Sequence, residues 1–164
     1  MPGATLTWLE MRDASQLVQA HRRAELELRE IGADEAALLA ETYVRIWNPL
    51  GGGGRTGWSE TDWRAELSRP GVRGWTAEIG GVPAGLLELE AGQDGEVGIV
   101  IFGLVPEFVG HGFGGAFLTA ATQTAWAEPS ARRVVVCTSS LDHPAAQPNY
   151  ERRGFHVFRA EVVS

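Results

Sequence analysis

A glycine-dense turn between a strand and a helix is the feature that most constrains this chain. In the stretch Glu96–Leu118, EVGIVIFGLVPEFVGHGFGGAFL, an apolar β-rich run breaks at Pro106 and a glycine-rich segment then opens directly into a helix. Glycine has no Cβ, so the main-chain N–H groups between Gly110 and Gly115 can approach a ligand closely. The helix N-terminus behind them adds partial positive charge. The sequence therefore predicts an anion-binding loop that fits a diphosphate.

The same glycines also spell a second pattern. Gly110, Gly112 and Gly115 fit the dinucleotide-binding motif G-x-G-x-x-G. That motif belongs near the start of a long series of βαβ units, with an acidic residue about 20 positions further on. Only about fifty residues follow Gly115, and Asp142, the acid considered for this role, comes somewhat late. An NAD(P)-binding oxidoreductase therefore remains the less favoured alternative.

Hydrophobic alternation and turn signals divide the rest of the chain into strands and helices. A hairpin with a Gly80-Gly81 turn, followed by β-α-β-α-β, predicts a mixed sheet of the α/β or α+β class with helices on both faces. Residues 24–29 suit a strand or the extension of a helix that Asp13 begins and that runs to about His21. The other expected strands are Thr5–Met11, Gly74–Ile79, Pro83–Glu90, Val97–Val105, Arg132–Ser139 and Phe155–Val163; the other expected helices are Asp34–Trp47, a helix capped by Ser59 and Asp62 that runs to Leu67, Gly112–Ala127 and Pro144–Arg153.

Two segments carry a resemblance to a known superfamily. The loop Val109–Gly114 follows the pattern Gln or Arg, two residues, Gly, one residue, Gly or Ala, except that Val109 stands at the first position. The segment Ala146–Phe155 follows Ala-x-x-x-Tyr-x-x-x-Gly-Phe with every spacing kept. With these motifs in this order, residues 73 to 158 resemble the GNAT superfamily of N-acetyltransferases.

The resemblance implies a fold and an activity. It implies a single acetyltransferase domain over residues 1–164 with a mostly antiparallel central sheet, in which residues 73–158 form the CoA-binding core and residues 1–70 supply acceptor-side elements. The implied reaction moves an acetyl group from acetyl-CoA to a primary amine of a small molecule or peptide by direct attack. The resemblance leaves open whether the chain forms a homodimer. A non-catalytic acyl-CoA-binding or interaction domain is the second alternative, because Val109 lacks the family's side-chain contact.

The resemblance also assigns residues to the site. Tyr150 matches the family's tyrosine after the CoA-binding helix, and a phenol with a pKa near 10 keeps a proton for a leaving thiolate. Glu88 is the first choice as general base, ahead of Glu90 and Glu96. His143 stands where the family often has an Asn and is either a base, a CoA contact or a helix-start residue. The implied cofactor contacts are Leu104, whose strand would offer an N–H to the oxyanion, and Val105, Val109, Gly110, His111, Gly112, Phe113, Gly114, Gly115 and His143, with His111 as a donor in place of the charge missing at Val109.

Charge and composition exclude several other classes. All fourteen basic residues are arginines, so the lysine of a P-loop, a protein kinase or a Schiff-base enzyme is missing. A net charge of −7 argues against nonspecific nucleic-acid binding and favours a cationic acceptor. The four histidines lack the paired spacing of a metal site, so no metal is expected.

Two features bear on location and on the core. No apolar run reaches the 18 or so residues that cross a bilayer, and the N-terminus has no basic start typical of a signal peptide, so we expect a cytoplasmic protein without a membrane partner. The single cysteine, Cys137, lies in the middle of an expected strand and is predicted to be a small core residue.

Aromatic residues surround a second glycine run, Gly51–Gly54. Trp47, Arg55, Trp58 and Trp63 flank it and place aromatic surfaces and one cation beside a flexible segment. A lid over the acceptor and ordinary core packing beside a mobile loop both explain this arrangement.

Overall fold

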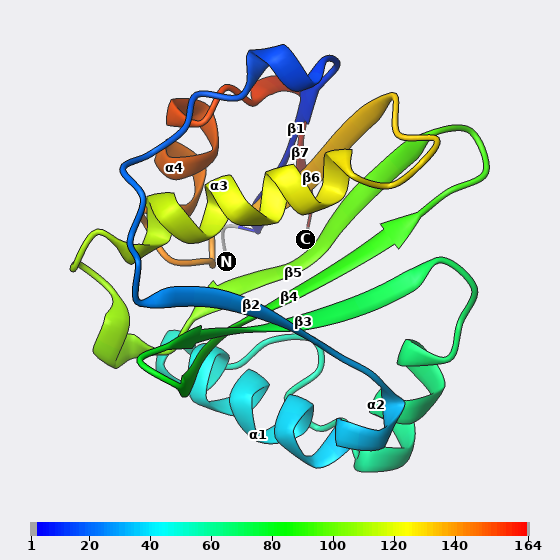
Figure 1. Ribbon diagram of the computed structural model, residues 1–164, viewed down its shortest axis with the longest axis vertical. Helices are drawn as coiled ribbons and strands as arrows, with labels where there is room; N and C mark the ends of the chain where they lie inside the picture. The colour runs from blue at the N-terminus through cyan, green and yellow to red at the C-terminus, as the bar shows by residue number, and fades with distance from the viewer. Residues whose placement is uncertain (1–2, 164) are drawn as a thin grey trace.

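Seven strands form one sheet in the computed structural model, which describes residues 3–163 (Figure 1). Their order across the sheet is β2-β3-β4-β5-β6-β1-β7, and every neighbouring pair is antiparallel except β5 and β6, which run parallel. The mixed, mostly antiparallel sheet expected above is therefore confirmed. The strands are β1 (Ala4–Met11), β2 (Leu26–Ile31), β3 (Val72–Ile79), β4 (Val82–Ala91), β5 (Glu96–Leu104), β6 (Arg133–Ser139) and β7 (His156–Val163).

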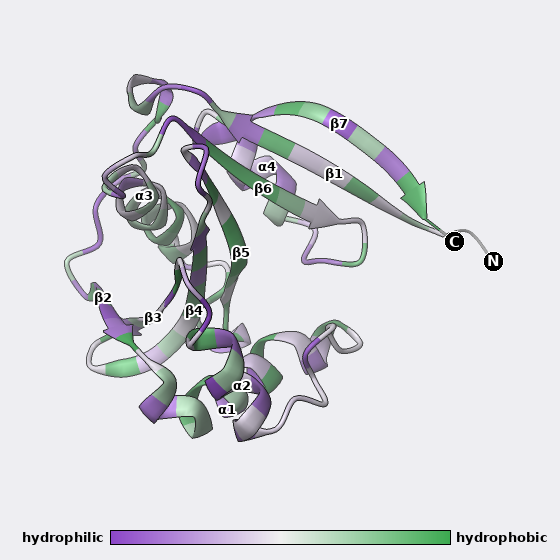
Figure 2. Ribbon diagram, turned by 90° about the vertical axis from the view of Figure 1, so that its right-hand side faces the viewer, coloured by the Kyte–Doolittle hydropathy of each residue, from purple (hydrophilic) through white to green (hydrophobic). Residues whose placement is uncertain are grey.

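Helices cover both faces of the sheet (Figures 1 and 2). Helices α1 and α2 pack on one face, and α3 and α4 on the other. Neighbouring residues of β4 show the division: Leu86 packs with the α1 and α2 side chains, whereas Leu87 packs with those of α3 and α4. The longest helix, α3, has 14 residues, and within residues 3–163 no helix has the length and apolar content to cross a membrane. The bounds are α1 (Ala36–Trp47), α2 (Glu60–Leu67), α3 (Phe113–Trp126) and α4 (Ala146–Arg152).

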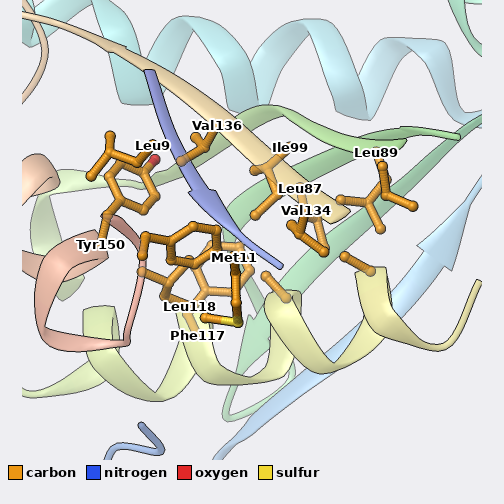
Figure 3. Close-up of a cluster of buried hydrophobic side chains, with 14 of the residues drawn as sticks. Leu9, Met11, Leu87, Leu89, Ile99, Phe117, Leu118, Val134, Val136 and Tyr150 are labelled. Atoms are coloured by element: carbon orange, nitrogen blue, oxygen red, sulfur yellow. The ribbon is translucent and has the colours of Figure 1, made fainter. Parts of the chain in front are cut away.

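The cluster beneath α3 and α4 joins distant parts of the chain. Residues of β1, β4, β5 and β6 meet Phe117 and Leu118 of α3, and Tyr150 of α4 lies at one end of the cluster (Figure 3). Phe117 and Leu118 are fully buried. This cluster fixes α3 and α4 on the sheet, and with them the loop that precedes α3.

The segment after β1 differs from the expected helix. Only a 3₁₀ turn forms, at Ala14–Gln16, and Asp13 caps it by accepting the Ser15 N–H at 2.8 Å. The following residues 18–23, here called the strap, cross α3 and α4. The Val18 N–H donates to the Arg153 carbonyl at 2.8 Å, and the Ala20 N–H donates to Thr119 Oγ1 at 3.0 Å. These tertiary hydrogen bonds satisfy main-chain groups that a helix would have paired within itself, and residues 26–31 become strand β2.

The expectation that Cys137 is a core residue is wrong. The cysteine is exposed, although its neighbours Val136 and Thr138 are buried. Successive side chains of a strand point to opposite faces, and α3 covers only the face to which Val136 and Thr138 point. Cys137 pairs with Trp8 on the other face.

Candidate active site between strands β5 and β6

The two parallel strands separate halfway along their length. Residues Glu96–Ile99 of β5 pair with Arg133–Val136 of β6, and no pairing continues beyond this point in the described chain. The register between β4 and β5 shifts at the same place, which leaves Val100 as an extra, bulged residue. Beyond the bulge, β5 stays with β4, while β6 diverges with β1 and β7 (Figure 2). A gap with unpaired main-chain groups therefore opens within the sheet.

One of the two contacts expected at the end of β5 faces this gap. The Val105 N–H donates to the Ala84 carbonyl at 2.8 Å, so it points toward β4, and Val105 is fully buried. Main-chain groups of successive residues in a strand point in opposite directions, so the N–H of Leu104 points into the gap. The structure thus places Leu104, and not Val105, at the expected position.

A cavity of about 540 Å³ fills the gap and continues to the loop before α3. Its apolar wall comes from Ile46, Trp47 and Leu50 at the end of α1 and from Phe102 of β5. Of the residues singled out in the sequence, Leu104, Val109, Gly110, Gly112, Gly114, Gly115, His143 and Tyr150 line the cavity, whereas Val105, His111, Phe113 and Glu88 are not among its lining residues. The sequence therefore located most of one wall and, of the apolar wall from α1, singled out Trp47 but not Ile46 and Leu50 as site residues, because these aliphatic residues carry no distinctive motif.

The loop before α3 offers main-chain donors to this cavity. Gly112 adopts a φ of +82°, which L-residues with side chains rarely adopt, and it turns the chain into the helix. No hydrogen bond within the described chain uses the N–H groups of Gly110, His111 or Gly112. The first N–H groups of α3 also have no partner inside the helix. These donors make the site suited to an anion such as a diphosphate.

A distant arginine supplies the positive charge that Val109 lacks. Arg23 of the strap donates from Nη1 to the carbonyl of His111, and its guanidinium lies 4.1 Å from the centre of the Phe113 ring. The carbonyl of His111 thus serves as an acceptor that holds this cation beside the loop. Sequence reasoning missed Arg23, because nothing in its local pattern connects it with a loop some ninety residues later.

Tyr150 lies at the junction of α4, the sheet and the cavity. The residue is 5% exposed, and its ring packs against Phe102 and Phe155 with centroids 6.0 Å apart in each case. Burial raises the pKa of the Tyr150 phenol above its usual value, because the charged form would lose its hydration. The phenol is therefore a neutral donor at physiological pH.

The hydrogen bonding of His143 leaves its Nε2–H group as a donor. Its Nδ1 accepts the N–H of Ala145 at 3.0 Å, so in the neutral ring the proton is on Nε2. This arrangement suits a contact to a ligand oxygen better than the role of a base. The neighbouring Asp142 also lines the cavity, where its carboxylate accepts the Thr138 hydroxyl at 2.9 Å and the Ser139 N–H at 2.8 Å. Across the described residues, no three His, Cys, Asp or Glu side chains gather closely enough to hold a metal ion.

Glu88 lies on the α1 and α2 side of the sheet, beneath an arginine. Arg55 binds both of its carboxylate oxygens, at 2.7 and 3.0 Å, and also reaches Glu66 at 3.1 Å. Burial, together with the neighbouring Glu66 carboxyl, raises the pKa of Glu88 to about 7 despite the opposing effect of Arg55. The two other glutamates considered for the base are also paired, Glu90 with Arg69 and Glu96 with Arg133, each at 2.7 Å.

The aromatic residues around Gly51–Gly54 pack as part of the core. The Arg55 guanidinium lies 4.3 Å from the ring centre of Trp58 and 5.1 Å from that of Trp63. Trp63 is 1% exposed. These contacts anchor the residues after the glycine run, which agrees with core packing, while Trp47 alone of this group reaches the cavity.

Comparison with known proteins identifies a family. The model of the acetyltransferase (GNAT) family matches residues 38–155. A comparison with curated proteins gives no match.

Solved structures share the fold at low sequence identity. A functionally unknown conserved protein from Staphylococcus epidermidis ATCC 12228 has a TM-score of 0.73 at 16% identity, covering 96% of this chain and 59% of its own. A GCN5-related N-acetyltransferase from Sphaerobacter thermophilus has a TM-score of 0.73 at 16% identity, covering 99% of this chain and 51% of its own. A tandem GNAT protein from the clavulanic acid biosynthesis pathway has a TM-score of 0.66 at 20% identity, covering 99% of this chain and 52% of its own. The chain thus spans little more than half the length of these proteins. Because the family model covers more than half of the sequence and the fold agrees with it, the chain belongs to the acetyltransferase (GNAT) family.

Proposed function

We propose that this chain binds acetyl-CoA between β5 and β6 and transfers the acetyl group to a primary amine of a small molecule or peptide. One observation carries the proposal: a single cavity joins the apolar gap in the sheet to the free N–H groups before α3. An apolar arm that ends in a diphosphate fits such a path, because its two parts need these two environments. Since acetyl-CoA is an intracellular metabolite, the proposal includes a cytoplasmic location.

The residues of the cavity have separate roles in the proposed reaction. Acetyl-CoA, when bound, supplies an acetyl group activated as a thioester. The Leu104 N–H, which β6 leaves unpaired, donates to the carbonyl oxygen of that group, where negative charge develops. Tyr150 keeps its proton on Oη, because burial raises its pKa, and gives it to the leaving thiolate, while the proton that the amine nitrogen loses on forming the amide restores the phenol. The loop from Val109 to Gly115 holds the diphosphate.

The amine is proposed to approach from the α1 side. Ile46, Trp47 and Leu50 form that wall of the cavity, and the residues offered there are mainly apolar. The chain has a net charge of −7, which favours the encounter with a cationic amine. The apolar wall would then bind the body of the substrate, and the negative charge of the chain would attract the ammonium group of the substrate.

A ligand screen followed by an activity assay tests this proposal. We expect acetyl-CoA and CoA, but not NAD, to raise the melting temperature, with a stabilisation of about 2.7 kcal/mol at a ligand concentration of 100 Kd. Release of free CoA thiol should follow when a panel of primary amines is added with acetyl-CoA. Stabilisation by CoA without thiol release from any amine would favour the non-catalytic acyl-CoA-binding alternative. Stabilisation by NAD alone would favour the oxidoreductase.

Glu88 has a pKa suited to a general base but lies outside the cavity lining. We expect Glu88→Gln to keep kcat within about tenfold of the wild type, because Arg55 and not substrate occupies its carboxylate. Steady-state kinetics from pH 6 to 9 check this. A loss of about 10²- to 10⁴-fold in kcat, together with loss of a pH dependence centred near 7, would establish Glu88 as the base.

A further inference from the structure

A second cavity, of about 630 Å³, also reaches the α3 N-terminus. The strap contributes His21 and Arg23 to its lining, and the end of α4 contributes Arg152 and Arg153. Gly112, Gly115, Asn149 and Arg152 line both this cavity and the one between β5 and β6. The two cavities are therefore neighbours that share the start of α3.

The arginines of α4 differ from most others in this acidic chain. Ten of the fourteen arginines form ion pairs with carboxylates. Within residues 3–163, Arg152 and Arg153 form none, although they are adjacent in sequence and line the same cavity. Neighbouring cations repel each other unless an anion lies between or beside them. The local charge is thus positive and uncompensated in a chain whose net charge is −7.

Arg153 is the more constrained of the two. Its Nε is buried and donates to no acceptor in the described chain. Burial, followed by the charge of Arg152, lowers the pKa of the Arg153 guanidinium, which shows that its surroundings do not favour the cation. A buried donor without an acceptor is costly, and an anion in the adjacent cavity would remove that cost.

Both guanidinium groups next to the loop occupy space that a glycine leaves free. A Cβ on Gly115 would lie 2.3 Å from Nη1 of Arg153, and a Cβ on Gly112 would lie 2.9 Å from Nη1 of Arg23. Gly112 and Gly115 therefore admit two cations at the head of α3, one from the strap and one from α4. The strap itself is pinned to α3 and α4 by the hydrogen bonds of Val18 and Ala20.

We propose that this second cavity binds the 3′-phosphate of coenzyme A, with Arg152 and Arg153 as its main ligands and Arg23 beside the diphosphate. The inference rests on the proposed function, because it assumes that CoA lies in the first cavity. In CoA the pantetheine arm, the diphosphate and the phosphorylated ribose follow one another. The gap in the sheet, the loop before α3 and the arginine-lined cavity follow one another in the same order. A phosphomonoester is a dianion with several acceptors, which planar guanidinium groups bind in pairs of hydrogen bonds.

Calorimetry with CoA and 3′-dephospho-CoA tests the assignment. We expect the wild type to bind CoA about 10- to 100-fold more tightly than dephospho-CoA, which is about the net contribution of one hydrogen bond to a charged group. Arg153→Gln and Arg152→Gln should each lower that ratio by about three- to tenfold, and the double variant should bring it close to 1. Affinity for dephospho-CoA should stay within about twofold. Arg152 is exposed, so its variant carries the test even where Arg153→Gln fails to fold.

Arg132→Gln is the matched control. Arg132 is exposed, forms no ion pair within the described residues and lies beside Gly95, away from both cavities, so this variant should keep the wild-type ratio while losing the same charge. Equal loss of affinity for both ligands in the α4 variants would move the arginines to the diphosphate and overturn the assignment. A wild-type ratio near 1 would overturn it while leaving CoA binding intact. Failure of the wild type to bind either ligand would instead remove the proposed function and this inference together.

Discussion

Replacing Tyr150 by phenylalanine is expected to lower kcat by about 10²- to 10⁴-fold while the dissociation constant for CoA changes by less than about twofold. The variant keeps the ring that packs against Phe102 and Phe155, so the wall of the cavity stays in place. It loses only the hydroxyl that would protonate the thiolate. Steady-state kinetics and calorimetry with CoA measure the two quantities separately.

The other tyrosine of the chain provides a control. Tyr43 accepts the main-chain N–H of Arg55 at 3.2 Å and stacks on Trp47, so Tyr43→Phe also removes one hydroxyl from a buried tyrosine. It should lower the melting temperature slightly and keep kcat within a few-fold.

Because burial raises the pKa of Tyr150, the wild type should also show no alkaline loss of kcat from this residue below about pH 10. Unchanged turnover in Tyr150→Phe would mean that solvent protonates the thiolate.

Gly112→Val is expected to weaken CoA binding by about 100-fold or more, which corresponds to about 2.7 kcal/mol. A branched side chain at a φ of +82° forces the turn into α3 to change, and its Cβ would displace Arg23 from the carbonyl of His111. The N–H groups of the loop would then no longer converge on one anion. Calorimetry with CoA measures the loss.

Gly81→Val is the control that separates a loss of CoA affinity at the loop from the backbone strain of valine at a positive φ. Gly81 has a φ of +80°, but it lies in the β3–β4 turn, where a Cβ would meet no atom within 4 Å. Both variants should therefore lose stability by a similar amount, about 1–2 kcal/mol, which urea unfolding measures. Only Gly112→Val should lose affinity. If both bound CoA as the wild type does, the diphosphate would not depend on the conformation of this loop.

Local signals in the sequence were sufficient for most elements. The capping box of Ser59 and Asp62 begins α2 as expected, with the Asp62 N–H bound to the Ser59 hydroxyl at 3.2 Å. The Gly80-Gly81 turn joins β3 and β4, because both glycines adopt the positive φ that the hairpin requires. The glycine-rich turn into α3 likewise depends on consecutive residues of the sequence. Such features depend on neighbours only a few positions apart, so a linear pattern contains them.

The sequence did not predict which elements pair or pack with one another. The sequence predicted a strand at residues 5–11 but not its place between β6 and β7, and it predicted a helix where the strap runs. The sequence also did not predict that Cys137 is exposed. Alternation along the strand defines two faces but does not say which of them α3 covers.

By itself the sequence determined the strand, the glycine turn and the helix around the loop before α3, and through two motifs it pointed to the acetyltransferase family. The tertiary structure alone decided which cations stand beside that loop, because Arg23 and Arg153 reach it from segments far away in the chain. It also decided that the sheet opens after Ile99. The physical reason is that main-chain geometry is set by adjacent residues, whereas burial, charge compensation and strand pairing depend on which distant segments the folded chain brings together.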